Sequence, residues 1–131
     1  MIALDTSAFV AMALGEPEAD GFIRAIARQE PLVGTPTLLE THMVLASRIG
    51  DAAAMAFVQA MVRRPSIHPV AFSLRMQEIA TEAFDRFGKG RHPAGLNFSD
   101  CMAYAVAKAH DVPLLFKGND FSRTDARSAA V

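Results

Sequence analysis

The sequence has little cysteine, no tryptophan and no long hydrophobic run. Its single cysteine, Cys101, cannot form an internal disulfide and has no second cysteine with which to build a zinc site. No stretch approaches the roughly 18 to 20 uncharged apolar residues that a membrane-spanning helix needs, and the N-terminus lacks the basic-then-apolar pattern of a signal peptide. We therefore expect a cytoplasmic protein with no membrane partner.

A strong net charge is also missing. The chain has 13 basic and 14 acidic side chains, and its formal charge at pH 7 is −1. Overall charge thus gives no sign of nucleic-acid binding. Because metal ions bound to several carboxylates would leave a mildly basic molecule, bulk charge neither supports nor excludes a phosphate-bearing substrate.

What the sequence does have is an alternation of short apolar strands with amphipathic helices. Its 131 residues, 51% of them hydrophobic, suit a single domain over 1–131. Strands are expected over 2–4, 31–35, 66–70 and 112–118. Helices are expected over 7–14, 16–29, 35–50, 51–64, 72–87 and 97–111, while the tail 121–131 shows no clear pattern. Since crossover connections favour parallel strands, we predict an α/β three-layer sandwich, a central mostly parallel sheet flanked by helices.

Four acidic residues fall near the carboxyl edge of this predicted sheet. Asp5 ends the first strand and Glu40 lies early in the helix after the second strand; Asp100 lies in the first turn of an alanine-rich helix and Asp120 follows the last strand. Ligands usually bind at this edge of a parallel sheet. A pair of carboxylates about 4 Å apart repels by on the order of 4 kcal/mol, so a cluster must protonate or hold a cation. Oxygen ligands favour Mg²⁺ or Mn²⁺, ions that can assist phosphodiester hydrolysis.

Each acid also has an ordinary structural explanation. Asp5 is a preferred residue type at a helix N-cap. Thr37 and Glu40 have the spacing of a capping box, and Asp100 suits the positive end of a helix dipole. Asp120 follows Asn in a pair that is typical of turns. Residue by residue these explanations stay open, whereas the set as a whole favours a site.

Three segments resemble the PIN-domain ribonucleases: the opening MIALDTSAFV, GKGRHPAGLNFSDCMAYAVAK (88–108) and PLLFKGNDFSRTD (113–125). Over nearly its whole length the chain is similar to the VapC toxins of bacterial toxin–antitoxin pairs. The chain departs from the family at Ser99, where glycine is frequent, and at Asn119, where a further aspartate is frequent. Neither departure removes one of the four acids.

The resemblance implies a PIN-like fold and an Mg²⁺- or Mn²⁺-dependent endoribonuclease that hydrolyses RNA with metal-activated water. It assigns Asp5, Glu40, Asp100 and Asp120 to the catalytic and metal-binding site. Asp5 and Asp100 would be the main ligands, and the other two would complete the set directly or through water. It also implies a VapB-type antitoxin that lays a segment into a hydrophobic groove, and a homodimer.

Further residues are candidates for contact with substrate. Thr6 or Ser7 is expected to hydrogen-bond a metal-bound water or the scissile phosphate. Lys and Arg supply most of the sequence-independent affinity for phosphate. The candidates for RNA contact, in and around the basic loop 88–95, are Arg86, Lys89, Arg91, His92 and Lys117. A solvated loop with no ligand is the alternative.

Two other functions compete with the nuclease. One is a non-catalytic PIN-like domain that binds RNA or protein and uses its acids only as caps. The other is an aspartyl-phosphate enzyme or receiver with Asp5 as nucleophile. The haloacid-dehalogenase pattern, however, has a second aspartate two residues further on, where this chain has Ser7.

Overall fold

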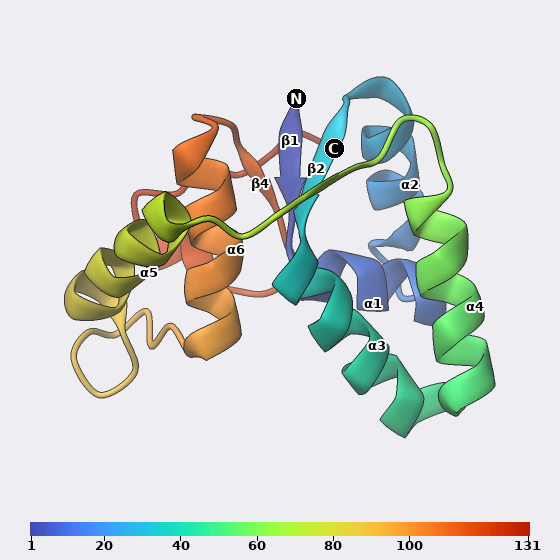
Figure 1. Ribbon diagram of the computed structural model, residues 1–131, viewed down its shortest axis with the longest axis horizontal. Coiled ribbons are helices and arrows are strands. Elements are labelled where there is room, and N and C mark those ends of the chain that lie inside the picture. The colour runs from blue at the N-terminus through green and yellow to red at the C-terminus, as the bar shows by residue number, and fades with distance from the viewer.

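A four-stranded parallel sheet runs through the middle of the computed structural model, which describes residues 1–131 (Figure 1). Its strand order is β3-β2-β1-β4. The strands are β1 (Ile2–Leu4), β2 (Pro31–Gly34), β3 (His68–Val70) and β4 (Leu114–Leu115). In the centre, Ala3 of β1 is in register with Leu32 of β2 and Leu114 of β4. The predicted α/β fold class is confirmed, and every strand pair is parallel.

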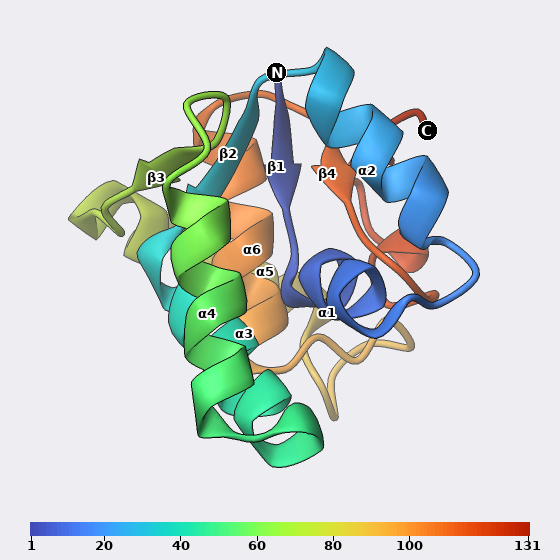
Figure 2. The same ribbon diagram turned by 90° about the vertical axis from the view of Figure 1, so that its right-hand side faces the viewer.

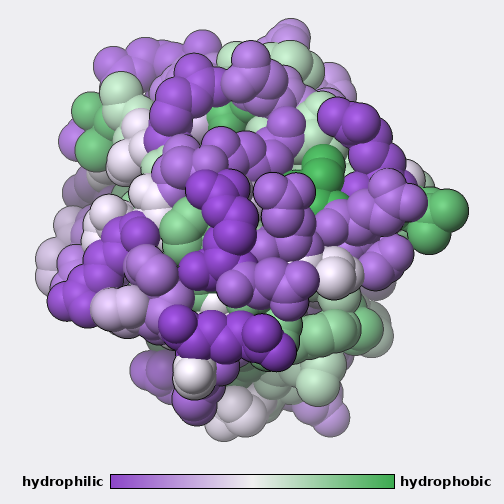
Figure 3. Space-filling view, turned by 90° about the vertical axis from the view of Figure 1, so that its left-hand side faces the viewer, coloured by the Kyte–Doolittle hydropathy of each residue, from purple (hydrophilic) through white to green (hydrophobic).

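Helices cover both faces of the sheet. They are α1 (Thr6–Leu14), α2 (Ala19–Arg28), α3 (Thr35–Ile49), α4 (Asp51–Val62), α5 (Leu74–Phe87) and α6 (Phe98–Ala109), with a short 3₁₀ helix at Phe121–Arg123. Figure 2 shows α1, α2 and α4 in front of the sheet and α5 and α6 behind it. The face that carries α5 is largely hydrophilic, as expected of an outer helix (Figure 3). None of the helices combines the length and the apolar character that a membrane crossing needs.

The sheet separates two apolar clusters. On one side α5 and α6 pack with β-strand residues such as Ala3 and Leu32, and on the other side α1 and α2 pack around Phe9 and Leu4. The small side chains of α6 let this helix approach the sheet closely. A Cβ atom added at Gly34, where β2 ends, would lie 2.9 Å from Cγ2 of Val106 on α6. This close contact fixes where α6 begins relative to the strand ends, and therefore where Asp100 lies.

The sequence-based boundaries differ from the structure mainly at helix starts. The helix expected from Glu16 begins at Ala19, because the Glu16 N–H donates to Ala11 O and so belongs to the end of α1. The helix expected from Phe72 begins at Leu74, because Ser73 is its N-cap and accepts a bond from Met76 N.

The last strand and the tail also differ from the prediction. β4 has only two residues instead of the expected 112–118. The chain leaves the sheet soon after Leu115, and Lys117 N donates to the Ser7 hydroxyl instead of to a strand. The tail 121–131 has more order than its pattern suggested, because it forms the 3₁₀ helix and then pairs Ser128 with Leu114 in a parallel bridge.

The close packing of α6 can be tested with two glycine substitutions. Gly34→Ala should lower the free energy of unfolding by about 1–3 kcal/mol, because the new methyl group overpacks against Val106. Gly21→Ala is the matched control, since Gly21 lies in α2 and a Cβ there would meet Val131 at an ordinary 3.7 Å. The control should gain up to about 1 kcal/mol. Chemical denaturation measures both, and equal stability of the two variants would contradict the packing described.

Candidate metal centre

All four predicted acids line one cleft, the acidic cleft, which has a volume of about 440 Å³. They come from four parts of the chain: the end of β1, the second turn of α3, the first turn of α6 and the segment after β4. The parallel sheet explains this meeting, because the carboxyl ends of its strands share one edge. The cleft is lined by Asp5, Thr6, Ser7, Val10, Glu16, Glu40, Val44, Asn97, Ser99, Asp100, Lys117, Gly118, Asp120 and Phe121.

Asp5 is both a helix cap and a wall of the acidic cleft. Its carboxylate accepts hydrogen bonds from Ser7 N at 3.0 Å and from Ser7 Oγ at 2.6 Å, while only 6% of the residue is exposed. Burial raises the pKa of Asp5, the bonds from Ser7 oppose that rise, and the negative charge of Glu40 adds to it. The capping role of Asp5 therefore does not exclude a position in the cleft wall, although the two looked like alternatives in the sequence.

Asp100 has the same double position at the start of α6. It forms a capping box with Asn97: Asn97 N donates to the Asp100 carboxylate at 3.1 Å, and Asp100 N donates to Asn97 Oδ1 at 2.9 Å. The pKa of Asp100 is raised to about 6, chiefly by burial, while a hydrogen bond from Asn97 lowers it. The charges of Asp5, Asp120 and Glu40 contribute to the rise. The acids thus act on one another electrostatically across the cleft.

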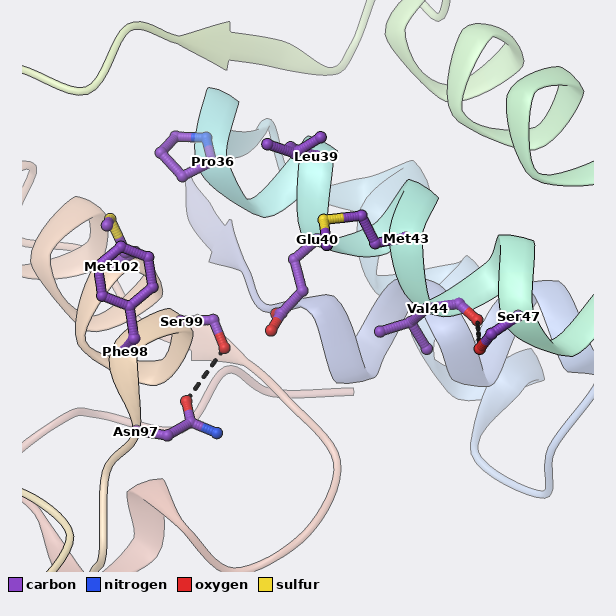
Figure 4. A pocket seen from close by; sticks show the side chains of 10 residues that line it. All are labelled: Pro36, Leu39, Glu40, Met43, Val44, Ser47, Asn97, Phe98, Ser99 and Met102. Atoms are coloured by element: carbon purple, nitrogen blue, oxygen red, sulfur yellow. Dashed lines mark hydrogen bonds between the residues drawn. The ribbon is translucent and has the colours of Figure 1, made fainter. Parts of the chain in front are cut away.

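Glu40 and Asp120 have no comparable local role. The capping box expected for Thr37 and Glu40 is wrong, because α3 already begins at Thr35 and its N-cap is Gly34. Glu40 lies in the second turn, and its carboxylate extends into the space between α3 and α6 (Figure 4). Asp120 is exposed, and its side chain makes no capping hydrogen bond to the 3₁₀ helix that follows it. Local structure therefore does not account for these two acids.

Thr6 contributes an unsatisfied hydroxyl to the same cleft. Its Oγ1 is buried and has no hydrogen-bond partner in the protein, although the residue is only 7% exposed. A buried polar group without a partner costs about 1–3 kcal/mol, so most such groups in proteins are paired. A ligand in the acidic cleft would supply the missing partner.

The carboxylates surround the cleft without forming a closed cage. No three His, Cys, Asp or Glu side chains converge closely enough to hold a metal ion by themselves. Mg²⁺ commonly keeps several waters and is bound by only one or two carboxylates together with substrate phosphate. The donor set, which is entirely oxygen, fits such a hydrated ion better than it fits zinc.

Lys117 is the one cation in the cleft wall, and two acids hold it. Its ammonium lies 3.0 Å from Glu16 and 3.2 Å from Glu18, which raises its pKa. Both glutamates precede α2, about a hundred residues away along the chain, so no local pattern indicates this contact. The positive charge at the cleft is thus already paired.

Four of the predicted RNA-contacting residues do not line the acidic cleft: Arg86, Lys89, Arg91 and His92. Arg86 is 3.5 Å from Asp125, and Arg91 is 3.9 Å from Asp85. His92 accepts a bond from Ala94 N within its own loop, and Lys89 is exposed. That they place positive charge beside the acidic cleft and contact RNA stays a prediction.

Comparison with known proteins places this chain in a family. The model of the PIN domain family matches residues 2–127. Ribonuclease VapC30 of Mycobacterium tuberculosis is 40% identical over 129 residues, which cover 98% of both chains. Ribonuclease VapC of Mycolicibacterium smegmatis is 41% identical over 124 residues, 93% of this chain and 95% of the other.

Solved structures show the same fold at lower identity. The toxin VapC20 of M. tuberculosis, described as cleaving the sarcin-ricin loop, superposes with a TM-score of 0.81 over 100% of both chains at 21% identity. VapBC2 of Rickettsia felis, solved on a DNA fragment from its promoter, gives a TM-score of 0.76 at 14% identity, covering 98% of this chain and 96% of the other. With its sequence relatives matched almost from end to end, the chain belongs to the PIN domain family, among the VapC ribonucleases.

Proposed function

We propose that this chain is an Mg²⁺- or Mn²⁺-dependent endoribonuclease and the toxin of a VapBC-type pair. One observation carries the proposal: four carboxylates from distant parts of the chain line one cleft, and the two most buried, Asp5 and Asp100, have raised pKa values. Such an arrangement is costly unless a cation neutralises it. The names of the relatives, which are ribonucleases, support RNA as the substrate.

In this proposal Asp5 and Asp100 would be the main ligands of the ion, and Glu40 and Asp120 would complete the set directly or through water. When bound, a divalent ion supplies Lewis-acid chemistry: it lowers the pKa of water and neutralises charge that develops on phosphate. The chain supplies the positions of the ligands. Asp5 is fixed by Ser7, whose hydroxyl in turn accepts a bond from Lys117 N at 2.9 Å, and Asp100 is fixed by the capping box.

Thr6 and Ser7 have different roles in the proposal. Ser7 Oγ already donates to Asp5, so it orients a ligand carboxylate. Thr6 Oγ1 has no partner in the protein and is free to donate to a phosphate oxygen or to a water in the cleft. Thr6 is therefore the better candidate for contact with substrate, and Ser7 is a positioning residue.

The proposal includes a VapB-type antitoxin and a homodimer. Two neighbours that share the fold were solved as toxin–antitoxin complexes, one from Klebsiella pneumoniae and one from R. felis. Phe9, Phe22 and Ile26 are buried in the core, whereas Met43 is 62% exposed and available to a partner. The exposed residues Met55 and Val62 add apolar surface on α4.

Replacing the two main ligands tests the site. Asp5→Asn and Asp100→Asn should each slow Mg²⁺-dependent cleavage of RNA by about 100-fold or more, because a loss of several kcal/mol of transition-state stabilisation corresponds to at least that factor. Both variants should fold, since Asn is itself a good N-cap at position 5, and at position 100 its side-chain oxygen can still accept the hydrogen bond from Asn97 N. Asp20→Asn, at an exposed acid of α2, is the control and should cleave at the parent rate.

The assay uses purified chain without antitoxin and labelled RNAs, with and without EDTA, while circular dichroism checks the fold. If Asp5→Asn and Asp100→Asn are folded and cleave as fast as the parent, that result would contradict the assignment of the site. A parent chain that binds RNA but never cuts it would instead support the non-catalytic domain.

Thermal stability should depend jointly on pH and Mg²⁺. Asp100 has a pKa of about 6 in the folded chain, against an ordinary value of 3.8, so its contribution to stability is complete below pH 3.8 and is lost as the pH rises through about 6. Metal must displace the same proton, so Mg²⁺ should raise the Tm little near pH 5 and clearly near pH 7.5.

At a free Mg²⁺ concentration about 100 times its Kd, the expected gain in the free energy of unfolding is about 2.7 kcal/mol. Differential scanning fluorimetry measures the Tm of the parent and of Asp100→Asn. In Asp100→Asn the joint dependence of the Tm on pH and Mg²⁺ should largely vanish. Equal stabilisation by Mg²⁺ at both pH values would argue against Asp100 as a ligand.

The ends of the products report on the chemistry. Attack by water with the ion in place should leave a 5′-phosphate on the downstream fragment, and ligation or mass spectrometry of the fragments detects it. A 2′,3′-cyclic phosphate would indicate attack by the ribose hydroxyl and would exclude the proposed reaction.

A further inference from the structure

Lys117 carries the only positive charge among the residues that line the acidic cleft. Its side chain is 35% exposed, and its ammonium pairs with the carboxylates of Glu16 and Glu18 at 3.0 and 3.2 Å. Glu16 also lines the cleft, so this ion pair is part of the cleft wall. The function proposed above uses the backbone of Lys117 and leaves its charge without a role.

Both ends of this lysine are anchored. Lys117 N donates to the Ser7 hydroxyl at 2.9 Å, which ties the backbone to the first turn of α1. The two glutamates belong to the connection between α1 and α2, which lies beside the chain that leaves β4 (Figure 2). Glu16 N donates in turn to Ala11 O at 3.0 Å, so this connection is itself tied to the end of α1. The ammonium is therefore held at a defined place in the cleft wall.

A phosphate that enters the acidic cleft needs a cation besides the metal ion. When the four metal-binding acids are ionised, a single divalent ion reduces their charge of −4 only to −2. The phosphate of RNA brings a further negative charge, which these acids repel. Proteins offset such charge with Lys or Arg in contact with the phosphate. Lys117 is the one side chain of the cleft that can do so.

The ion pair can release its ammonium readily. Lys117 has three N–H donors, and two glutamates occupy at most two of them. The side chains of Glu16 and Glu18 are 29% and 34% exposed, so water can solvate them when the lysine turns away. Exposed ion pairs are weak, whereas a hydrogen bond from an ammonium to a phosphate oxygen is charge-assisted. An exchange of glutamate for phosphate keeps the lysine paired throughout.

We infer that Lys117 is the phosphate-binding cation of the acidic cleft, and that Glu16 and Glu18 hold its ammonium off the metal-binding acids until a phosphate of RNA takes their place. The inference rests on the proposed function. Lys117 forms its ion pairs with these two glutamates and with none of the four metal-binding acids. An unpaired ammonium would be attracted to those acids and would compete with the metal ion. The two glutamates are thus positioning residues, whereas Lys117 touches the substrate.

The salt dependence of RNA binding tests the contact with phosphate. Fluorescence anisotropy of a short fluorescein-labelled single-stranded RNA gives the Kd at several KCl concentrations and a fixed low Mg²⁺ concentration. All variants carry Asp5→Asn, so that the RNA stays intact. Lys117→Met should bind RNA about 10- to 100-fold more weakly, and the slope of log Kd against log[KCl] should fall by about 0.7, the value for one phosphate of a single strand. Lys117→Arg should keep the slope.

Lys108→Met is the matched control for the loss of a paired lysine. Lys108 is 38% exposed and its ammonium lies 3.0 Å from Asp125, so it resembles Lys117 in exposure and pairing, but it does not line the acidic cleft. Its replacement should leave the affinity and the slope unchanged. Circular dichroism checks that each variant folds.

The holding role of the glutamates has a test of opposite sign. Replacing both, Glu16→Gln with Glu18→Gln, should strengthen RNA binding by about 2- to 10-fold, because Lys117 no longer has to leave an ion pair. In the Lys117→Met background this gain should be largely lost. A purely structural ion pair would give no gain, and a general loss of repulsion would give the same gain with and without Lys117.

Three results would overturn the inference while RNA cleavage by the parent leaves the proposed function intact. They are an unchanged affinity and slope in Lys117→Met, an equal loss in Lys117→Met and Lys108→Met, and an equal gain from the glutamate substitutions with and without Lys117. If Lys117→Met does not fold, the glutamate variants still decide, because an affinity equal to that of the parent would overturn the inference. A chain that neither binds nor cleaves RNA would overturn both proposals.

Discussion

The mutual repulsion of four carboxylates in one cleft is the constraint on which the rest of this structure depends. Asp5 and Asp100 are nearly buried, and each raises the energy of the other's ionised form, as do Glu40 and Asp120. The fold brings these groups together by placing three strand ends and the start of α6 at one edge of a parallel sheet. A molecule selected only for stability would have dispersed them, and the cation that the proposed function assigns to the cleft would relieve their repulsion.

Two of the acids are held by the same hydrogen bonds that begin helices. Asp5 caps α1 and Asp100 completes the capping box of α6, so the backbone that starts each helix also fixes the direction of a carboxylate. The close contact between Gly34 and Val106 sets the position of α6 on the sheet and links core packing to the geometry of the site. Glu40 and Asp120 are held less firmly, which suits groups that act through water. Fold stability and site geometry therefore share parts of one framework.

Local patterns in the sequence predicted what depends on local chemistry. Apolar runs bounded by Gly and Pro gave the strands, and the four acids could be placed at one edge because parallel topology follows from alternating elements. The start of α2 was missed because Glu16 bonds back to Ala11, and the order of the tail was missed because Ser128 pairs with Leu114. The pairing of Lys117 with Glu16 joins residues too distant for any local signal. The exposure of Phe98 and Met43 depends on how the helices pack, so no local pattern could predict it.

A diffraction experiment on crystals soaked with Mn²⁺ tests the central claim most directly, because the anomalous signal locates the ion without reference to activity. The account predicts a peak in the acidic cleft within bonding distance of the carboxylates of Asp5 and Asp100, about 2.0–2.2 Å for a hard divalent ion with oxygen ligands, and with the Asp100 pKa of about 6 the peak should weaken in acidic soaks. A structure saturated with Mn²⁺ in which no ion lies between these two side chains, or in which it lies elsewhere, would contradict the account.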